Sequence, residues 1–220
     1  MKIAISGMIS SGKSSLTTSL VEYYSKFKPA TFLSEFKEDD IVFHNLLKWH
    51  LQRRANVTLA FETYVMDSHI SELTNIEAQM KRKYDEFDIF LDRFCVEHII
   101  FAQNAFDLSS RHWKSYKKMV DQMINPTNIP DFVIFLDVDF DTFKKRLFKR
   151  NRSAEVDNWD TNYDYYKKMH STYKQNFIDL CHEYNVNYAI INTNNLDENE
   201  VLKASVDLIE QNRKKLKNEN

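Results

Sequence analysis

The fold is decided by the stretch Gly7-Met8-Ile9-Ser10-Ser11-Gly12-Lys13-Ser14. It matches the pattern G-x-x-x-x-G-K-S/T in full, with a short apolar run at residues 2–6 before it and a helical pattern after it. In a turn of this kind the backbone N–H groups can point at phosphate oxygens, and the N-terminus of the next helix adds positive potential. The stretch therefore predicts a binding site for a nucleoside triphosphate.

Two side chains of this loop have separate expected roles. Lys13 should reach the β- and γ-phosphates of ATP, and the Ser14 hydroxyl should hold Mg²⁺. The other contacts to ATP are expected from Gly7, Met8, Ile9, Ser10, Ser11, Gly12 and Ser15. The loop thus predicts ATP with Mg²⁺ and leaves open which acceptor receives the γ-phosphate.

Glycine is almost absent outside this loop. The chain of 220 residues has two glycines, Gly7 and Gly12, where an average content of about 7% would give roughly fifteen. A dinucleotide fold needs three glycines in one turn, and a protein kinase needs a Gly-rich loop and a further Gly, so both are excluded. No glycine is left for the Asp-x-x-Gly segment of a switch GTPase. The low content itself is attributed to an AT-rich genome.

Composition excludes several further classes. The formal net charge of −2 argues against a dedicated nucleic-acid binder. No apolar run approaches the roughly 18 residues that span a bilayer. The two cysteines, Cys95 and Cys181, have no metal-binding spacing, which favours a reduced, cytoplasmic setting. We expect residues 1–220 to form one domain without a nucleic-acid or membrane partner.

Apolar runs alternate with helical periodicity along the chain. Strands are expected at residues 2–6, 31–34, 87–91, 131–138 and 187–191. Helices are expected at residues 13–24, 41–54, 57–83, 96–106, 113–124, 143–148, 163–184 and 198–216. This alternation predicts an α/β protein, with a parallel sheet covered on both faces. Ligands of such sheets bind at the carboxyl ends of the strands.

Acidic residues lie at or just beyond the carboxyl ends of three of the expected strands. Glu35 comes after the second, Asp92 with Arg93 after the third, and Asp137 at the end of the fourth. An acid next to an arginine beside a phosphate loop suits both the metal and the transferring phosphoryl group. A surface ion pair that caps the next helix is the alternative for Asp92 and Arg93. For Asp137 the structural interpretation is favoured.

The most basic stretch, Lys144–Arg152, allows three interpretations. Its cations suit the C-terminus of a helix because of the helix dipole. A nucleic-acid patch is a second possibility, which the overall acidity disfavours. A third is a mobile lid whose arginines close over the phosphates and exclude water, since the planar fork of arginine matches phosphate oxygens.

Four further segments, in order along the chain, resemble the deoxyribonucleoside kinase family. Asp92–Ala102 resembles its Asp/Glu-Arg-Ser segment and the helix that follows, and Phe61–Tyr64 resembles its Phe-Gln-x-Tyr. Arg146–Glu155 resembles its Arg-Gly-Arg-x-x-Glu lid, and Met169–Tyr173 its Leu-His-x-x-Tyr. The resemblance runs from residue 1 to about 192. It implies a P-loop kinase of the deoxyadenosine, deoxyguanosine or deoxycytidine kinase type, with three α/β/α layers, a five-stranded parallel sheet and an arginine-rich lid at about 146–158.

The resemblance also implies how the reacting groups are held. Glu35 would be the general base that accepts the proton of the sugar 5′-hydroxyl, a role typically worth about 10²- to 10⁴-fold in rate. Arg93 would orient Glu35 and the 5′-oxygen. Asp92 would join Ser14 in holding Mg²⁺. A solvated acidic turn is the alternative for Glu35, and its neighbour Glu38 and the pair Asp39-Asp40 are rival bases.

The lid would supply charge to the phosphates and a contact to the sugar. Arg150 and Arg152, with Arg146, would stabilise the phosphoryl group in transfer, where such arginines can be worth about 10³- to 10⁵-fold. Arg146 and Arg150 would also contact ATP, and Glu155 would accept a hydrogen bond from the 3′-hydroxyl. Asn151 stands where the family has Gly. Since Asn tolerates left-handed backbone conformations, we expect the turn to survive.

The implied nucleobase pocket contains one informative departure. Phe61 and Phe101 would enclose the base, with His69 and His98 near them; ordinary core packing is the alternative for all four. Glu62 stands where the family Gln reads the base. An ionised Glu offers acceptors only, so it suits the adjacent donors of guanine best and thymine least. Adenine or cytosine would require a protonated Glu62 or a shifted pose. We expect a purine preference.

Two other departures concern aromatic residues. Phe94 replaces the Ser of the Asp/Glu-Arg-Ser segment, which somewhat resembles thymidylate kinase. The family tyrosine near the 3′-hydroxyl falls at Leu51, and Trp49 or His50 could replace it. The resemblance further implies a homodimer and feedback inhibition by a deoxynucleoside triphosphate.

Two rival functions are weighed. A nucleoside monophosphate kinase needs an arginine near the second strand for the acceptor phosphate, but residues 31–40 are acidic. A regulatory P-loop ATPase would predict hydrolysis or switching and would not need Glu35.

Overall fold

The computed structural model describes residues 1–37, 39–151, 156 and 159–219. All strand pairs in its sheet are parallel, and the order is β2-β3-β1-β4-β5. The strands are β1 (Lys2–Gly7), β2 (Ala30–Leu33), β3 (Asp88–Asp92), β4 (Phe132–Asp137) and β5 (Tyr188–Asn192). The expected five-stranded parallel sheet is confirmed.

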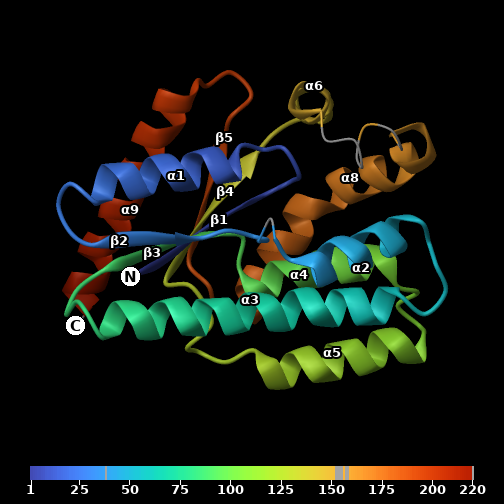
Figure 1. Ribbon diagram of the computed structural model, residues 1–220. Coiled ribbons are helices and arrows are strands. Elements are labelled where there is room, and N and C mark those ends of the chain that lie inside the picture. The colour runs from blue at the N-terminus through green and yellow to red at the C-terminus, as the bar shows by residue number, and fades with distance from the viewer. Residues whose placement is uncertain (38, 152–155, 157–158, 220) are drawn as a thin grey trace.

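Helices cover both faces of the sheet. One face carries α1 (Lys13–Tyr24) and α9 (Glu198–Glu219). The other carries α3 (Thr58–Lys81), α4 (His98–Ala105), α5 (Arg111–Met123) and α8 (Trp159–Glu183) (Figure 1). Successive strand residues point to opposite faces: Ile3 and Ile5 pack with α1 and α9, while Ala4 packs with the other helices. These are the three expected α/β/α layers. In the part of the chain that the structure describes, no helix is long and apolar enough to cross a membrane.

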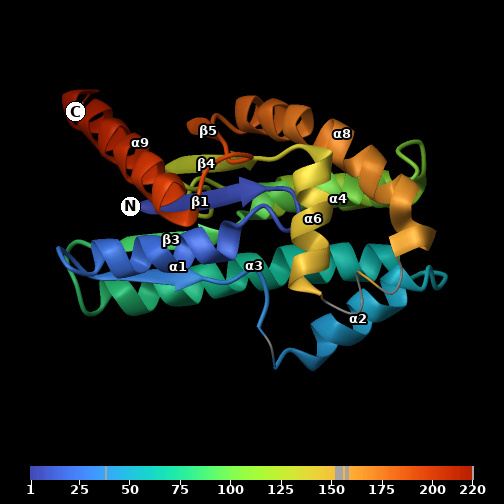
Figure 2. The same cartoon turned by 90° about the horizontal axis from the view of Figure 1, so that it is seen from above.

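Several helix boundaries differ from the sequence-based expectation, and the largest difference is at α8, which begins four residues before the expected residue 163. The helix expected at residues 96–106 begins as a 3₁₀ turn, η1 (Cys95–Glu97), before α4. The helix α6 (Phe140–Arg150) begins three residues earlier than expected, because the Asp139 carboxylate accepts a hydrogen bond from the Thr142 N–H at 2.7 Å and caps its N-terminus. Viewed from above, α6 crosses the end of the sheet toward which β1 points (Figure 2).

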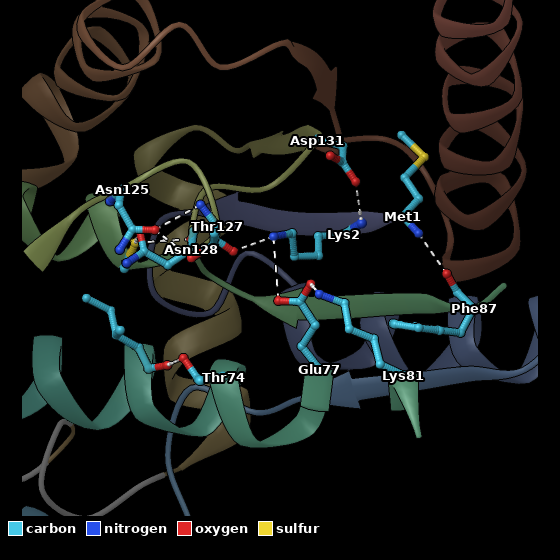
Figure 3. A network of polar contacts seen from close by, with 12 residues as sticks. Met1, Lys2, Thr74, Glu77, Lys81, Phe87, Asn125, Thr127, Asn128 and Asp131 are labelled. Atoms are coloured by element: carbon cyan, nitrogen blue, oxygen red, sulfur yellow. Dashed lines mark hydrogen bonds and ion pairs between the residues drawn. The ribbon is translucent and has the colours of Figure 1, made fainter. Parts of the chain in front are cut away.

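Polar contacts between residues far apart in sequence connect the segments at the amino-terminal ends of the strands (Figure 3). The Lys2 N–H donates to Asp131 Oδ2 at 2.7 Å, which links β1 to the residue before β4. The Lys2 ammonium contacts the Thr127 carbonyl and lies 3.8 Å from Glu77 Oε2 on α3. These contacts give this end of the sheet a structural role, and the residues expected at a ligand site lie at the other end.

Candidate active site

The phosphate loop joins β1 to α1, and its two glycines are needed for different reasons. At Gly7, with φ of 140°, a Cβ would lie 2.6 Å from the Leu136 carbonyl oxygen and 2.8 Å from Ser11 Oγ. At Gly12, φ is 102° and a Cβ would meet nothing within 4 Å. Gly7 is therefore required by close packing on β4, and Gly12 by a backbone conformation that other residues rarely adopt.

Lys13 is buried behind this loop, with 6% of its surface exposed. Its ammonium donates to the Met8 carbonyl at 3.2 Å, so the side chain reaches back across the turn. Burial lowers the pKa of Lys13, and the nearby Arg93 cation lowers it further, while the carboxylates of Asp92 and Glu35 oppose the shift. The ammonium therefore lies among the groups that end β2 and β3.

Ser14 and Asp92 meet at the start of α1 and the end of β3. The Ser14 hydroxyl donates to Asp92 Oδ2 at 2.5 Å, and Asp92 Oδ1 is buried without a hydrogen-bond partner among the described residues. A hydroxyl beside a carboxylate with an unused oxygen fits Mg²⁺, which takes few protein ligands and shares the rest with water and phosphates. No cluster of three or more His, Cys, Asp or Glu placed to hold a metal occurs in the described ranges, so a closed metal cage is not formed there.

Arg93 links the phosphate loop to Glu35. It follows β3 with φ of 73°, a conformation that costs a non-glycine residue about 1–3 kcal/mol. Its side chain is 1% exposed, its Nε donates to Glu35 Oε1 at 2.5 Å, and its Nη1 donates to the Gly7 carbonyl at 2.9 Å. A strained, buried arginine thus holds a carboxylate beside the loop.

Electrostatics around this pair favour a base of raised proton affinity. Burial raises the pKa of Glu35, and the Arg93 and Lys13 cations oppose that shift. Burial by itself would lower the pKa of Arg93, but the surrounding carboxylates, Glu35 first, raise it well above its ordinary value. The Glu35 side chain remains 18% exposed. It can therefore be reached by a substrate while Arg93 stays charged.

Two residues of this cluster were not assigned a role from sequence. Glu97 is completely buried, and its Oε1 accepts hydrogen bonds from Arg93 Nη1 at 2.5 Å, from the Tyr173 hydroxyl at 2.5 Å and from the Gly7 N–H at 3.3 Å. Both residues lie inside segments already quoted for the family resemblance. The available signal was an acid four residues after Arg93, at the spacing of one helical turn.

Glu62 is buried on α3, with 2% of its surface exposed. Burial raises its pKa to about 8. The pKa values of Tyr116 on α5 and Tyr165 on α8 are raised by burial and then by the Glu62 charge, so Glu62 lies near each of these two tyrosines. The Tyr116 hydroxyl is buried without a hydrogen-bond partner in the described part of the chain. The expectation of an ionised Glu62 therefore needs revision, because a pKa of about 8 leaves this carboxyl mainly protonated at neutral pH.

The two phenylalanines predicted to enclose the nucleobase each pack against other side chains of this region. The Phe61 ring is stacked with His50, with centroids 4.7 Å apart. The Phe101 ring lies under the Arg93 guanidinium, 4.8 Å from its Cζ to the ring centroid. Their roles at the base stay a prediction. Of the two candidates for the missing tyrosine, His50 lies against Phe61, whereas Trp49 packs with the Arg54 guanidinium.

The buried histidines form a pair. His98 Nε2 lies 3.2 Å from His69 Nδ1, and both residues are buried. Burial lowers the pKa of both rings, so the pair is neutral. The predicted contact of His98 with substrate remains a prediction. Phe94 points away into the core, where its ring meets Phe177 edge-on at 6.4 Å.

The lid region is described in part. Arg146 on α6 donates to the Ser11 carbonyl at 3.0 Å and to the Thr193 carbonyl at 2.9 Å, which ties α6 to the phosphate loop. Arg150 is exposed in the last turn of α6. Asn151 ends the helix with φ of 54° and ψ of 42°, so the expected left-handed Asn is confirmed. Predictions for Arg152 and Glu155 fall outside the described residues.

Asp137, the acid that ends β4, has a structural partner. Its Oδ2 accepts a hydrogen bond from the Lys174 ammonium of α8 at 2.6 Å. This contact agrees with the structural interpretation that its sequence position favoured.

The family follows from comparison with known proteins. A family model described as deoxynucleoside kinase matches residues 3–217. The chain belongs to the deoxynucleoside kinase family. Membership makes it a kinase that takes its phosphoryl group from a nucleotide, and it does not favour the monophosphate kinase or the regulatory ATPase.

Relatives and a solved structure are similar over most of the chain. An uncharacterised protein of Mycoplasma genitalium is 26% identical over 191 residues, which cover 86% of this chain and 81% of that protein. The deoxyadenosine kinase of Lactobacillus acidophilus is 26% identical over 181 residues, covering 78% and 77%. A solved structure of deoxyadenosine kinase from M. mycoides, with dCMP and a flexible dCDP bound, has a TM-score of 0.69 at 20% identity and covers 96% of this chain and 100% of its own. The last similarity establishes a shared fold.

Proposed function

We propose that this kinase transfers the γ-phosphoryl group of ATP to the 5′-hydroxyl of a deoxyribonucleoside. The observation that carries the proposal is the bridge made by Arg93, whose Nη1 donates to the Gly7 carbonyl at 2.9 Å while its Nε donates to Glu35 at 2.5 Å. The loop that would hold the donor phosphates is thereby joined to a carboxylate that is partly exposed. This arrangement suits a reaction in which a hydroxyl acceptor loses a proton beside the γ-phosphate.

In the proposed step, one bond to the γ-phosphorus forms and another breaks while the residues of the site hold the proton and the phosphate charge. The 5′-oxygen forms a bond to the γ-phosphorus, the bond from that phosphorus to the β,γ-bridging oxygen breaks, and ADP leaves. Glu35 accepts the proton of the 5′-hydroxyl. Lys13 neutralises charge on the β- and γ-phosphates, and the lid arginines Arg146, Arg150 and Arg152 serve the phosphoryl group. Ser14 and Asp92 would hold Mg²⁺, which when bound offsets phosphate charge.

For the nucleobase we propose a purine preference in which adenine fits the protonated form of Glu62. A protonated carboxyl has one donor and one acceptor, as Gln has, and matches the N6 amino group and a neighbouring ring nitrogen of adenine. The ionised form has acceptors only and matches the N1 and N2 donors of guanine. With burial raising the pKa of Glu62 to about 8, both forms are accessible near neutral pH. Relatives named deoxyadenosine kinase and deoxyguanosine kinase are similar to this chain at 26% and 27% identity, which agrees with a purine without choosing between the two.

Product analysis tests the reaction. The protein is incubated with Mg-ATP and an equimolar mixture of the four deoxynucleosides, and in a separate reaction with Mg-ATP and their monophosphates, and the products of each are separated by mass. We expect deoxynucleoside 5′-monophosphates, with the purines formed fastest. Only diphosphates, or only free phosphate from ATP, would contradict the proposal.

A pH series tests the nucleobase assignment separately. As pH rises through about 8, Glu62 ionises, so the ratio of kcat/KM for deoxyadenosine to that for deoxyguanosine should fall. In Glu62→Gln the side chain is neutral at every pH, so the ratio should be flat and should favour adenine. The highest kcat/KM for thymidine, or the same pH dependence in both proteins, would show that Glu62 does not select the base.

A further inference from the structure

Glu97 lies between the two halves of the proposed site. It ends η1, four residues after Arg93, and none of its surface is exposed. One of its oxygens, Oε1, accepts from the Gly7 N–H, from Arg93 Nη1 and from the Tyr173 hydroxyl. The other, Oε2, is buried without a hydrogen-bond partner among the described residues. A buried carboxylate is costly unless its partners use its charge, so this placement calls for a role.

The contacts of Glu97 and Arg93 converge on Gly7. The Gly7 N–H donates to Glu97, and the Gly7 carbonyl accepts from Arg93. Gly7 is also fixed from the other side, since a Cβ there would lie 2.6 Å from the Leu136 carbonyl on β4. The ion pair of Glu97 and Arg93 therefore holds Gly7, the first residue of the phosphate loop, and Arg93 of this pair also holds Glu35.

Tyr173 of α8 completes this support. Its hydroxyl donates to Glu97 Oε1 at 2.5 Å and lies 2.6 Å from Arg93 Nη1, and its ring meets Phe101 edge-on at 5.7 Å. The guanidinium is thus fixed in position by a carboxylate, a phenol and an aromatic ring. Preorganised charge of this kind needs no rearrangement at the moment of reaction.

We propose that Glu97, supported by Tyr173, is a positioning residue that sets the register between the phosphate loop and the Arg93–Glu35 pair. It touches neither phosphate nor acceptor in this arrangement and acts through Gly7 and Arg93. The inference rests on the proposed function, since it assigns Glu35 to the acceptor hydroxyl. A displacement of about 1 Å between reacting groups can cost about 10²-fold in rate, so loss of this register should appear in kcat.

The test compares Glu97→Gln with Glu183→Gln, a matched change at an exposed carboxylate that pairs with Lys117. In Glu97→Gln we expect kcat for deoxynucleoside phosphorylation to fall about 10- to 100-fold. The Kd of a fluorescent ATP analogue should change less than about threefold, because the loop backbone is kept. Glu183→Gln should match the wild type. Tyr173→Phe, which removes the hydroxyl and keeps the ring, should lower kcat in the same direction by less.

A pH profile separates positioning from a merely structural role. The groups around Glu35 are Arg93, Lys13, Asp92 and Glu97, and the negative charge of Glu97 helps to raise the Glu35 pKa. Its removal should move the acid limb of kcat/KM to lower pH. An unchanged kcat in Glu97→Gln would overturn the inference. So would a variant that loses thermal stability and has raised KM values while the acid limb of its kcat/KM profile stays at the wild-type pH. The wild type is assayed first. If it forms no deoxynucleoside monophosphate, the proposed function itself fails, and the variants are not compared.

Discussion

The donor side and the acceptor side of this site are built in opposite ways. The phosphate loop is one contiguous stretch, residues 7–14, and its shape comes from backbone: two glycines and a positive-φ serine at position 10. The acceptor side is assembled from side chains that follow β2 and β3 or lie on α3, η1 and α8, of which Arg93, Glu62 and Glu97 are nearly or fully buried. Backbone can be specified by a short motif, whereas buried charges depend on partners brought from far along the chain.

The acceptor side should give the largest loss of activity. Glu35→Gln keeps the size of the side chain and removes the base, so kcat should fall about 10²- to 10⁴-fold while ATP binding is retained. In the wild type, activity should rise with pH through a Glu35 pKa that burial raises above its ordinary value. The variant should lack this acid limb. Normal turnover by Glu35→Gln would mean that another group is the base.

The two glycines sharpen the donor side of the comparison. Gly7→Ala adds a clash with the Leu136 carbonyl to backbone strain and should cost roughly 4 kcal/mol in the free energy of unfolding. Gly12→Ala meets no atom within 4 Å and should cost only about 1–2 kcal/mol. Urea unfolding measures both. Equal losses would show that packing on β4 does not distinguish the two positions.

Glu62 should reveal a stability cost on the acceptor side. Its pKa is about 8 when folded, against an ordinary 4.5, so the folded state keeps a proton that the unfolded chain releases between these values. The wild type therefore loses stability as pH rises from about 4.5 to 8. Glu62→Gln does not titrate, so it should be more stable than wild type by roughly 4 kcal/mol at pH 8 and by little near pH 4.5.

The matched control for this measurement is Glu183→Gln. Glu183 is half exposed, so its stability difference from the wild type should stay small across the same pH range. A difference for Glu62→Gln that does not grow with pH would contradict a raised pKa for this carboxyl.

The smallest expected effect lies at the end of α6. Asn151 has a φ of 54°, and its N–H donates to the Leu147 carbonyl at 3.2 Å. Asn151→Ala should cost about 1 kcal/mol, because Ala adopts this left-handed conformation less readily, whereas Asn151→Gly should be neutral or slightly stabilising. Thermal unfolding of the two variants measures the difference. Equal melting temperatures would mean that the turn does not require a left-handed residue.

Most of the fold could be predicted from sequence because it follows local rules. Strands and helices followed from apolar periodicity, and the helix after the loop was predicted at residues 13–24, as α1 is found. The errors lie at helix boundaries: Asp139 decides the start of α6, and α8 begins at Trp159 where residue 163 was expected. The 3₁₀ start before α4 also has no signal in periodicity.

The candidate site was predictable only in part. Arg93 was placed beside Glu35 through the family resemblance, and the structure brings the two into contact. Glu97 and Tyr173 received no role, because a buried acid and a buried tyrosine look like ordinary helix residues until their partners are known. Glu62 was treated as ionised, since a residue type carries its ordinary pKa and only its surroundings change it.

The sequence by itself determined the phosphate loop, the parallel α/β arrangement and the identity of the acidic and basic side chains. These depend on local conformation and on periodicity, which neighbouring residues set. Only the tertiary structure decided which polar and charged groups meet. Arg93 and Glu97 hold Gly7, and Ser14 donates to Asp92. Glu62 is buried without an ion pair in the described part of the chain. Burial and charge pairing are properties of residues distant in sequence, and they set the protonation states on which the proposed chemistry depends.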